Sequence, residues 1–260
     1  MNSQDESSKP QKPDMIFPTI MTGLCLFYVC ICICICMCAA LLLINKIPPI
    51  TDLFESTLIP VSCPAIPAGW QRIMKNDFAN NRYVWPVGKN TNAYDDTDLQ
   101  IVDGLLRFDV KAHQGVYDYQ IPSFDSRYVE DSYITAQARK VSGPWDAEYG
   151  LVFRVQDEKQ LFFSIQDSGS VQVYTRDAMG DWGDLFFNGR SNNINVGDTN
   201  QLVVFVEGNN YTFCVNQYVV GEVNNSDYPY GESGIAVELR KANDEASFEY
   251  DDYMIYVPVK

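Results

Sequence analysis

Beyond Trp70 the chain alternates apolar and polar residues with a period of two, interrupted by short turn signals. The clearest example covers residues 99–110, where Asp103 and Gly104 separate two alternating segments. An Asp-Gly pair supplies the positive φ angles of a tight hairpin turn. No stretch beyond Trp70 keeps the apolar period of about 3.6 residues that an amphipathic helix requires. The pattern therefore predicts β-strands joined by hairpins.

Further short segments with the same alternation follow, between turn residues such as those at 167–169 and 208–210. They cover residues 133–141, 149–155, 161–166, 171–176, 202–207, 211–216, 218–223, 234–239 and 248–257. A series of short strands without helices between them predicts an all-β fold. We expect residues 70–260 to form an antiparallel jelly-roll β-sandwich, preceded by one transmembrane α-helix.

The predicted helix rests on residues 15–45, which contain no charged side chain. Its apolar run, residues 19–44, would span roughly 39 Å as a helix, against roughly 30 Å of hydrocarbon core. The run continues past Ala39 and Ala40, the one candidate for a signal-peptide cleavage site, so we expect a membrane span over residues 15–46. Two lysines precede the run and Lys46 alone closely follows it, which favours a cytoplasmic N-terminus and an extracytoplasmic C-terminal domain at the cell membrane.

Two polar segments flank the predicted helix. Residues 1–14 are rich in Ser, Gln, Lys and Asp, which predicts a disordered cytoplasmic tail. Residues 47–69 contain five prolines and no sustained period, which predicts a semi-rigid extended stalk. The sandwich is therefore expected to stand off the membrane as an ectodomain.

Five cysteines alternate with other apolar residues from Cys30 to Cys38, inside the predicted helix. On a helix they divide between two faces, so they do not form a zinc site, and we interpret them as small apolar residues or as a helix-association surface. Cys63 and Cys214 lie outside that run. In an oxidising compartment they could pair, while a free or an intermolecular thiol is an equal alternative.

Charge excludes one class of partner. The whole chain has a formal net charge of −15, and residues 69–260 carry 29 acidic and 16 basic side chains, a net charge of −13. A domain this acidic repels phosphate backbones, so nucleic acid is not expected as a partner. Solubility, or the binding of cations, is the plain interpretation of the charge.

Three segments resemble the concanavalin A-like lectin/glucanase superfamily, and within it the bacterial membrane-anchored domains related to the 3-keto-disaccharide hydrolase family. They are residues 77–88 (DFANNRYVWPVG), 141–154 (VSGPWDAEYGLVFR) and 248–256 (FEYDDYMIY). The resemblance covers roughly residues 78–258 and implies the fold far more strongly than an activity.

The motif that the glucanases of this superfamily use is incomplete in this chain. They present Glu-x-Asp-x-x-Glu on a strand, because retaining hydrolysis needs a nucleophile and an acid/base roughly 5 Å apart. The nearest string contains Glu249 and Asp251, and the second Glu is missing. His113, the one histidine, has no Gly-x-Ser-x-Gly elbow to accompany it. We therefore expect no enzymatic activity.

The resemblance implies that a sugar binds on the concave sheet. With Leu151, Phe153 and Val155 pointing inward, and the same alternation applied to other strands, the outward polar side chains form a stripe. Sugar sites combine such groups with flat aromatic rings, and a solvated sheet face is the alternative. The predicted ligand residues are Gln137, Arg139, Arg154, Gln166, Tyr174 and Arg176, with Trp145 and Trp182 in adjoining loops.

One acidic turn is a candidate for structural calcium, which prefers several carboxylate and carbonyl oxygens on a loop. It contains Asp95, Asp96 and Asp98, and an ordinary acidic turn is the alternative.

The function predicted from the sequence is a membrane-anchored extracytoplasmic recognition module that binds a glycan without catalysis. The alternatives are a structural or protein-interaction subunit of a membrane or cell-surface complex and, third, a glycoside hydrolase.

Overall fold

A computed structural model describes residues 61–125, 127–157, 159–177 and 181–259. Pro60–Lys260 form one compact unit. The described residues contain no helix that is long and apolar enough to cross a bilayer. The predicted tail (1–14) and membrane helix (15–46) lie outside the described residues, as does most of the predicted stalk.

Fifteen strands in the described part of the chain form two sheets, and all their pairings are antiparallel. The nine-stranded sheet consists of Trp70–Asn76 (β1), Gly88–Thr91 (β2), Asp95–Val102 (β3), Leu105–Ala112 (β4), Ser132–Ser142 (β6), Asn200–Glu207 (β11), Asn210–Val215 (β12), Tyr218–Asn224 (β13) and Glu245–Pro258 (β15). Their order is β13-β12-β11-β6-β15-β4-β3-β2, with β1 also paired to β15.

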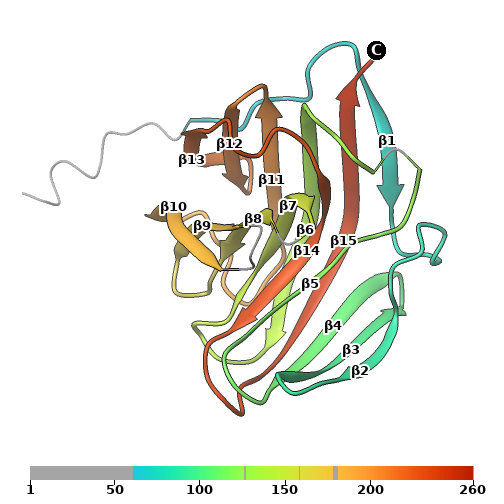
Figure 1. The fold of residues 1–260 in the computed structure, drawn as a ribbon, viewed down its shortest axis with the longest axis vertical. Coiled ribbons are helices and arrows are strands. Elements are labelled where there is room, and N and C mark those ends of the chain that lie inside the picture. Colours follow the sequence, from blue (N-terminus) through green and yellow to red (C-terminus); the bar gives the residue numbers. More distant parts are fainter. Residues whose placement is uncertain (1–60, 126, 158, 178–180, 260) are drawn as a thin grey trace, which may run out of the picture. The chain divides into compact units, whose positions relative to one another are not determined.

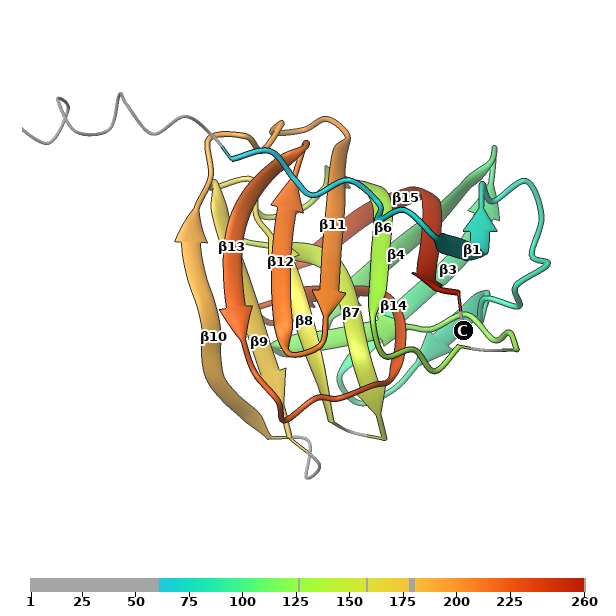
Figure 2. The ribbon, with the colours of Figure 1, turned by 90° about the horizontal axis from the view of Figure 1, so that it is seen from above.

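The six-stranded sheet consists of Val116–Gln120 (β5), Glu148–Gln156 (β7), Lys159–Ile165 (β8), Ser170–Arg176 (β9), Trp182–Arg190 (β10) and Glu232–Leu239 (β14). Their order is β10-β9-β8-β7-β14-β5. Figure 1 shows β13, β12 and β11 in one layer above β10, β9 and β8, and Figure 2 shows the same two layers from above. At the other side of the molecule, β2 and β3 line the same cleft as β5 (Figure 1).

The core lies between the sheets because every second side chain of the central strands enters that space. Phe108, Phe153, Phe213 and Phe248 come from four different strands, and each is 0% exposed. The rings of Phe153 and Phe213 meet with their centroids 6.0 Å apart. Burying one such ring contributes about 1.5–3 kcal/mol. The all-β antiparallel sandwich predicted from the alternation is confirmed.

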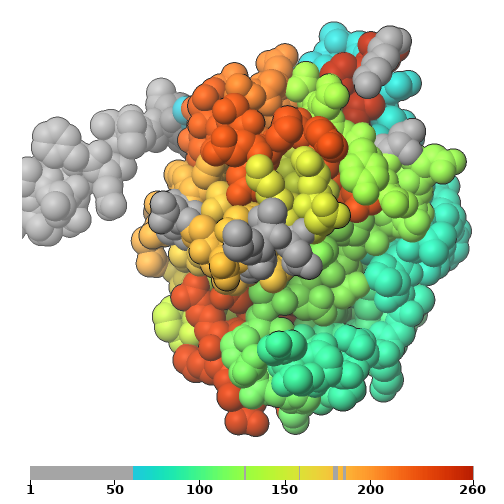
Figure 3. Space-filling view, in the orientation of Figure 1, coloured from blue at the N-terminus to red at the C-terminus, as the bar shows by residue number. Residues whose placement is uncertain are grey.

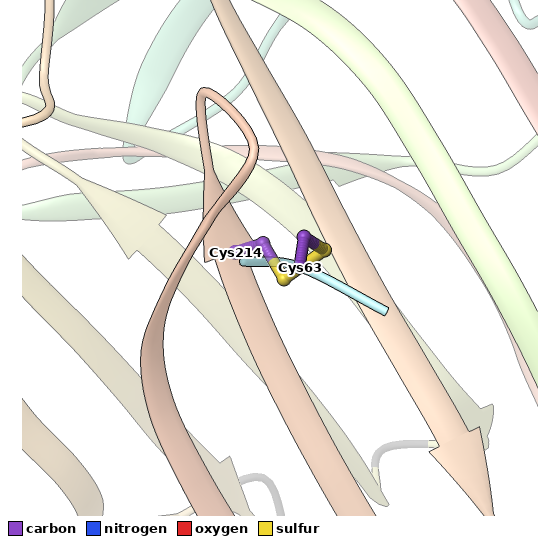
Figure 4. The surroundings of a disulfide bond; sticks show 2 residues. All are labelled: Cys63 and Cys214. Carbon is purple, nitrogen blue, oxygen red and sulfur yellow. A yellow bond between two sulfur atoms is a disulfide. The ribbon is translucent and has the colours of Figure 1, made fainter. Parts of the chain in front are cut away.

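The first described residues lie on the outer face of the nine-stranded sheet. A disulfide joins Cys63 to Cys214 of β12, with an S–S distance of 2.11 Å (Figure 4). Backbone hydrogen bonds on each side hold the segment against the start of β13: Cys63 N donates to Gln217 O over 2.7 Å, and Val219 N donates to Val61 O over 2.8 Å. The pairing that the sequence left open is therefore formed, and this part of the predicted stalk packs on the domain.

A bulge in β7 changes the faces of its last residues. Arg154 has a positive φ of 57°, and β7 shifts register there against both neighbouring strands. Gly231 crosses close to this point, where an added Cβ would lie 2.3 Å from the Arg154 carbonyl carbon, so a side chain does not fit. As a result Val155 packs with Val152 on the outer side of the six-stranded sheet. The expectation that Val155 points inward is wrong, because the bulge breaks the alternation.

Candidate functional site

A cleft of about 710 Å³ opens where the edge strand β5 lies beside β2 and β3. We call it the edge cleft. Asp95 of β3 and Asp118 of β5 line it from the two sheets, and Tyr117, Arg176 and Trp182 line it from the outer side of the six-stranded sheet. Figure 3 shows the teal residues of β2 and β3 bordering the green residues of β5 on the face in view. The cleft exists because β3 and β2 continue the larger sheet beyond β4, whereas β5 ends the smaller sheet.

Aromatic side chains form one wall of the edge cleft. The ring of Trp182 contacts that of Tyr117 edge-on with centroids 4.8 Å apart, and that of Tyr174 with centroids 5.7 Å apart. Phe162 packs beneath, with its centroid 5.2 Å from that of Tyr117. The guanidinium of Arg176 lies 5.9 Å from the Trp182 ring centroid. Trp182 is nevertheless 45% exposed, so part of a flat apolar ring remains available to a ligand.

A buried carboxylate organises the neighbouring part of the same face. Glu148 begins β7, and its side chain is 0% exposed. Its Oε2 accepts a hydrogen bond from Ser164 Oγ over 2.5 Å, and its Oε1 accepts one from Gln166 Nε2 over 2.9 Å. Tyr174 OH donates to Oε1 over 3.2 Å, and Arg240 forms an ion pair with the same oxygen. Each oxygen of Glu148 is thus already occupied by partners from within the protein.

Glu238 is the direct cross-strand neighbour of Glu148, because the register of β14 and β7 pairs the two residues. Burial, and next the negative charge of Glu148, raise the pKa of the Glu238 carboxyl to about 7, although Arg240 acts in the opposite direction. Among the described residues, none donates a side-chain hydrogen bond to Glu238. The two glutamates therefore differ in role: Glu148 is a fully bonded anchor, while Glu238 can change its charge near neutral pH.

Two further carboxyl groups line the edge cleft. Asp95 is only 3% exposed, and its Oδ1 accepts a hydrogen bond from Asn92 Nδ2 over 2.6 Å. Burial raises its pKa. Asp118 accepts from Gln120 Nε2, with N–O distances of 3.2 and 3.3 Å. Burial, followed by the charge of Asp95, raises the pKa of Asp118 to about 6. Neither carboxyl forms an ion pair with a described lysine or arginine.

Four of the predicted ligand residues share one surface. Gln166, Tyr174, Arg176 and Trp182 all lie on the outer face of the six-stranded sheet or at its rim. Gln166 and Tyr174 bond to Glu148, while Arg176 and Trp182 line the edge cleft. The alternation along β8 and β9 was sufficient to place Gln166, Tyr174 and Arg176 together, whereas Trp182, expected in a loop, begins β10.

Two other residues of the predicted stripe lie elsewhere. Gln137 and Arg139 are on β6 of the nine-stranded sheet, where Arg139 forms an ion pair with Glu249 over 2.5 Å. The predicted stripe is therefore not one surface, because alternation identifies the faces of a strand but not the sheet that the strand joins. Glu249 lies on β15 of that same sheet. The Glu249 carboxylate, which belongs to the incomplete glucanase-like motif, therefore already has an ion-pair partner within the protein, Arg139.

Arg154 and Trp145 also lie apart from the edge cleft. Arg154 is only 2% exposed because the β7 bulge turns it into the protein, where Nη1 donates to Val129 O over 3.2 Å and to Pro229 O. It is therefore a structural residue rather than part of an outward stripe. Trp145 is 67% exposed in the loop between β6 and β7, and it does not line the edge cleft.

The acidic turn considered for calcium is part of β3, so its side chains alternate between the faces of the sheet. Asp95 is buried, whereas Asp96 contacts His113 over 3.0 Å and Asp98 forms an ion pair with Lys89 over 3.3 Å. The three carboxylates do not converge. The described residues contain no group of three or more His, Cys, Asp or Glu side chains arranged to hold a metal ion.

The sequence did not draw attention to Tyr117, Asp118, Glu148 or Glu238. The sequence did contain one indication of Glu148 and Glu238. The central strands of the six-stranded sheet are apolar on both faces, as Val152 and Phe162 show, so burying a carboxylate in such a strand costs free energy. Glu148 and Glu238 occupy those positions. Asp118 carries no comparable signal, because its burial depends on β3, which is distant in sequence.

No protein-family model matches the sequence, and no curated protein matches it. Among solved structures, the GlcNAcα1-4Gal-releasing endo-β-galactosidase from Clostridium perfringens is similar, with a TM-score of 0.54 and 10% identity, over 75% of this chain and 66% of that one. The endo-1,3-β-glucanase (laminarinase) catalytic domain from Thermotoga petrophila RKU-1 gives 0.50 and 7%, over 74% of this chain and 99% of that one.

The κ-carrageenase from Pseudoalteromonas carrageenovora, solved with an oligotetrasaccharide of κ-carrageenan, also has a TM-score of 0.50, with 12% identity over 78% of this chain and 100% of that one. Identities this low establish the fold alone. The fold is that of the concanavalin A-like lectins and glucanases, so the resemblance seen in the sequence is confirmed at that level. The narrower resemblance to the 3-keto-disaccharide hydrolase relatives stays a prediction.

Proposed function

We propose that this chain is a non-catalytic glycan-recognition module, displayed outside the cytoplasm on a membrane anchor, and that the edge cleft is its binding site. The observation that carries the proposal is the partly exposed ring of Trp182, which lies against Tyr117 in a cleft of about 710 Å³. A pyranose stacks on such a ring while neighbouring polar side chains bond to its hydroxyls. The polar lining includes Asp118 and Gln120 of β5 and Gln114 just before it.

The state of Glu148 and Glu249 supports binding without catalysis. Retaining and inverting glycosidases need two carboxyl groups that reach the glycosidic bond. Glu148 is fully buried and bonded to four side chains, so it has no free face for a substrate. Glu249 is bonded to Arg139 on the other sheet. Asp95 and Asp118 do line the edge cleft, so turnover of a glycan is measured together with its binding.

The disulfide supports an extracytoplasmic location. Disulfides persist in oxidising compartments and are rare in the cytosol. The Cys63–Cys214 bond also fixes the chain that follows the predicted membrane helix to the outer face of the nine-stranded sheet. Membrane anchoring through residues 15–46, with a cytoplasmic N-terminus, completes the proposed arrangement.

The test uses the compact unit 60–260, expressed with its disulfide, on an array of oligosaccharides and polysaccharides. We expect binding that Trp182→Ala reduces at least tenfold, because the stacking surface is lost. Trp145→Ala is the matched control: it removes an exposed tryptophan outside the cleft and should leave binding unchanged. Absence of binding to every glycan would refute the proposal, and release of new reducing ends by the wild-type unit would assign a hydrolase instead.

A further inference from the structure

We propose that the edge cleft selects glycans that carry free amino groups, so that its ligand is an unacetylated amino-sugar oligosaccharide. The inference rests on the proposed function and adds the charge of the ligand to it. Its basis is a pair of carboxyl groups that face the cleft from two different sheets and form no ion pair with a described lysine or arginine.

Asp95 and Asp118 are unusual in being enclosed yet unpaired. Asp95 is 3% exposed and its one side-chain hydrogen bond comes from the neutral amide of Asn92. Asp118 bonds to the neutral amide of Gln120. Carboxylates removed from water are normally paired with a cation, because an isolated buried charge is costly. Among the described residues, neither forms an ion pair with a lysine or arginine, and His113, which acts on Asp95 through its charge when protonated, bonds to Asp96.

The basic side chains that line the cleft, Lys89 and Arg176, interact with residues other than Asp95 and Asp118. Lys89 forms an ion pair with Asp98, whose side chain lies on the other face of β3. Arg176 lies over the ring of Trp182. The cleft therefore offers two carboxyl groups to a ligand, and an ammonium group is the complement that would satisfy them.

The aromatic wall fits the same ligand. An amino sugar has an apolar ring face, which can stack on Trp182, and an ammonium group at its edge. Both carboxyl groups line the same cleft as that ring. Residues 69–260 carry a net charge of −13, which attracts a cationic chain from a distance and repels sulfated or uronic glycans.

A divalent metal fits the two carboxyl groups less well. Calcium takes about six to eight oxygen ligands, several of them carboxylates on one loop. Asp95 and Asp118 come from different sheets, and no third carboxylate among the described residues joins them in a metal-binding group. An ammonium group needs only a few acceptors, which the pair provides.

The experiment compares a glucosamine hexamer, its fully N-acetylated form and a neutral glucan hexamer by calorimetry on the unit 60–260, at about pH 6.5, where Asp118, with its pKa of about 6, is mostly ionised. We expect the amine form to bind about tenfold tighter than the acetylated form. Asp118→Asn and Asp95→Asn preserve size and neutral hydrogen bonding, and each should bring that ratio towards one. Asp109→Asn is the control, because Asp109 pairs with Arg107 outside the edge cleft. Thermal unfolding of each variant reports whether it folds.

The outcomes separate the two claims. Equal affinity for the amine and acetylated forms would overturn the charge selection and leave glycan recognition standing. Absence of binding to all three sugars and to the array would overturn the proposed function itself. Equally tight binding of a lysine-rich peptide or of Ca²⁺, lost in Asp118→Asn, would overturn the assignment to amino sugars.

Discussion

Replacing Glu238 by glutamine tests the electrostatics of the outer face of the six-stranded sheet. Glu238 lies directly opposite Glu148, and the pKa of its carboxyl is raised from 4.5 to about 7. Each unit of pKa corresponds to about 1.36 kcal/mol, so ionised Glu238 destabilises the fold by up to about 3 kcal/mol. Its side chain keeps some contact with water, so we expect Glu238→Gln to stabilise the domain by about 1–3 kcal/mol at pH 8.

The direction of the pH dependence follows from the raised pKa. Between roughly pH 4.5 and 7 the folded state binds more protons at this site than the unfolded state does. The wild-type domain therefore loses stability from this site as the pH rises through that window. The glutamine variant has no proton to lose there, so its advantage should grow from near zero at about pH 4 to its full value at about pH 8.

Urea denaturation of the wild type and of Glu238→Gln across this pH range, followed by tryptophan fluorescence, measures the difference. Glu222→Gln is the control for the loss of one negative charge from an acidic domain, because Glu222 is exposed on the edge strand β13. A variant that is less stable than the wild type at pH 8 would refute the reasoning. It would mean that attraction to Arg240 outweighs both burial and the charge of Glu148.

Three further changes test the framework of the domain. Cys214→Ser should lower the free energy of unfolding by about 2–5 kcal/mol, and a reductant should lower the wild type to the same level in urea denaturation. Arg154→Ala should cost about 1–3 kcal/mol in the same assay, because the Pro229 carbonyl loses its donor and the Val129 carbonyl keeps only the N–H of Gly231, while the folded variant still binds glycan. Gly150→Ala should cost about 1–3 kcal/mol or more, because its Cβ would lie 1.9 Å from Phe163 O; unchanged thermal unfolding would contradict this.

Much of the fold could be predicted from the local alternation of apolar and polar residues. A period of two with Asp103-Gly104 at a turn predicts strands β3 and β4 because side chains of a strand alternate between its faces whatever it pairs with. For the same reason, Tyr174 and Arg176 could be assigned to the outer face of β9 from sequence. The alternation failed at Arg154, where a bulge held by the close passage of Gly231 shifts the register.

The assignment of strands to sheets needed the tertiary structure. Gln137 and Arg139 have the alternation of an outward face, yet their strand belongs to the nine-stranded sheet. The pairing of strands into sheets depends on contacts between residues far apart in sequence, and the local pattern of apolar and polar residues does not predict these contacts. The Cys63–Cys214 bond is such a contact, with a sequence separation of 151 residues.

Composition and periodicity are properties of neighbouring residues, so they were enough to predict an acidic chain of alternating strands with an apolar segment before them. Which charges are enclosed depends on the three-dimensional fold. The sequence neighbours of Asp95 and Asp118 are ordinary polar residues. The two carboxyl groups come close to each other, without a lysine or arginine partner, because β3 and β5 line one cleft. The energy of a charge depends on the atoms around it in space, and folding brings those atoms together from both sheets.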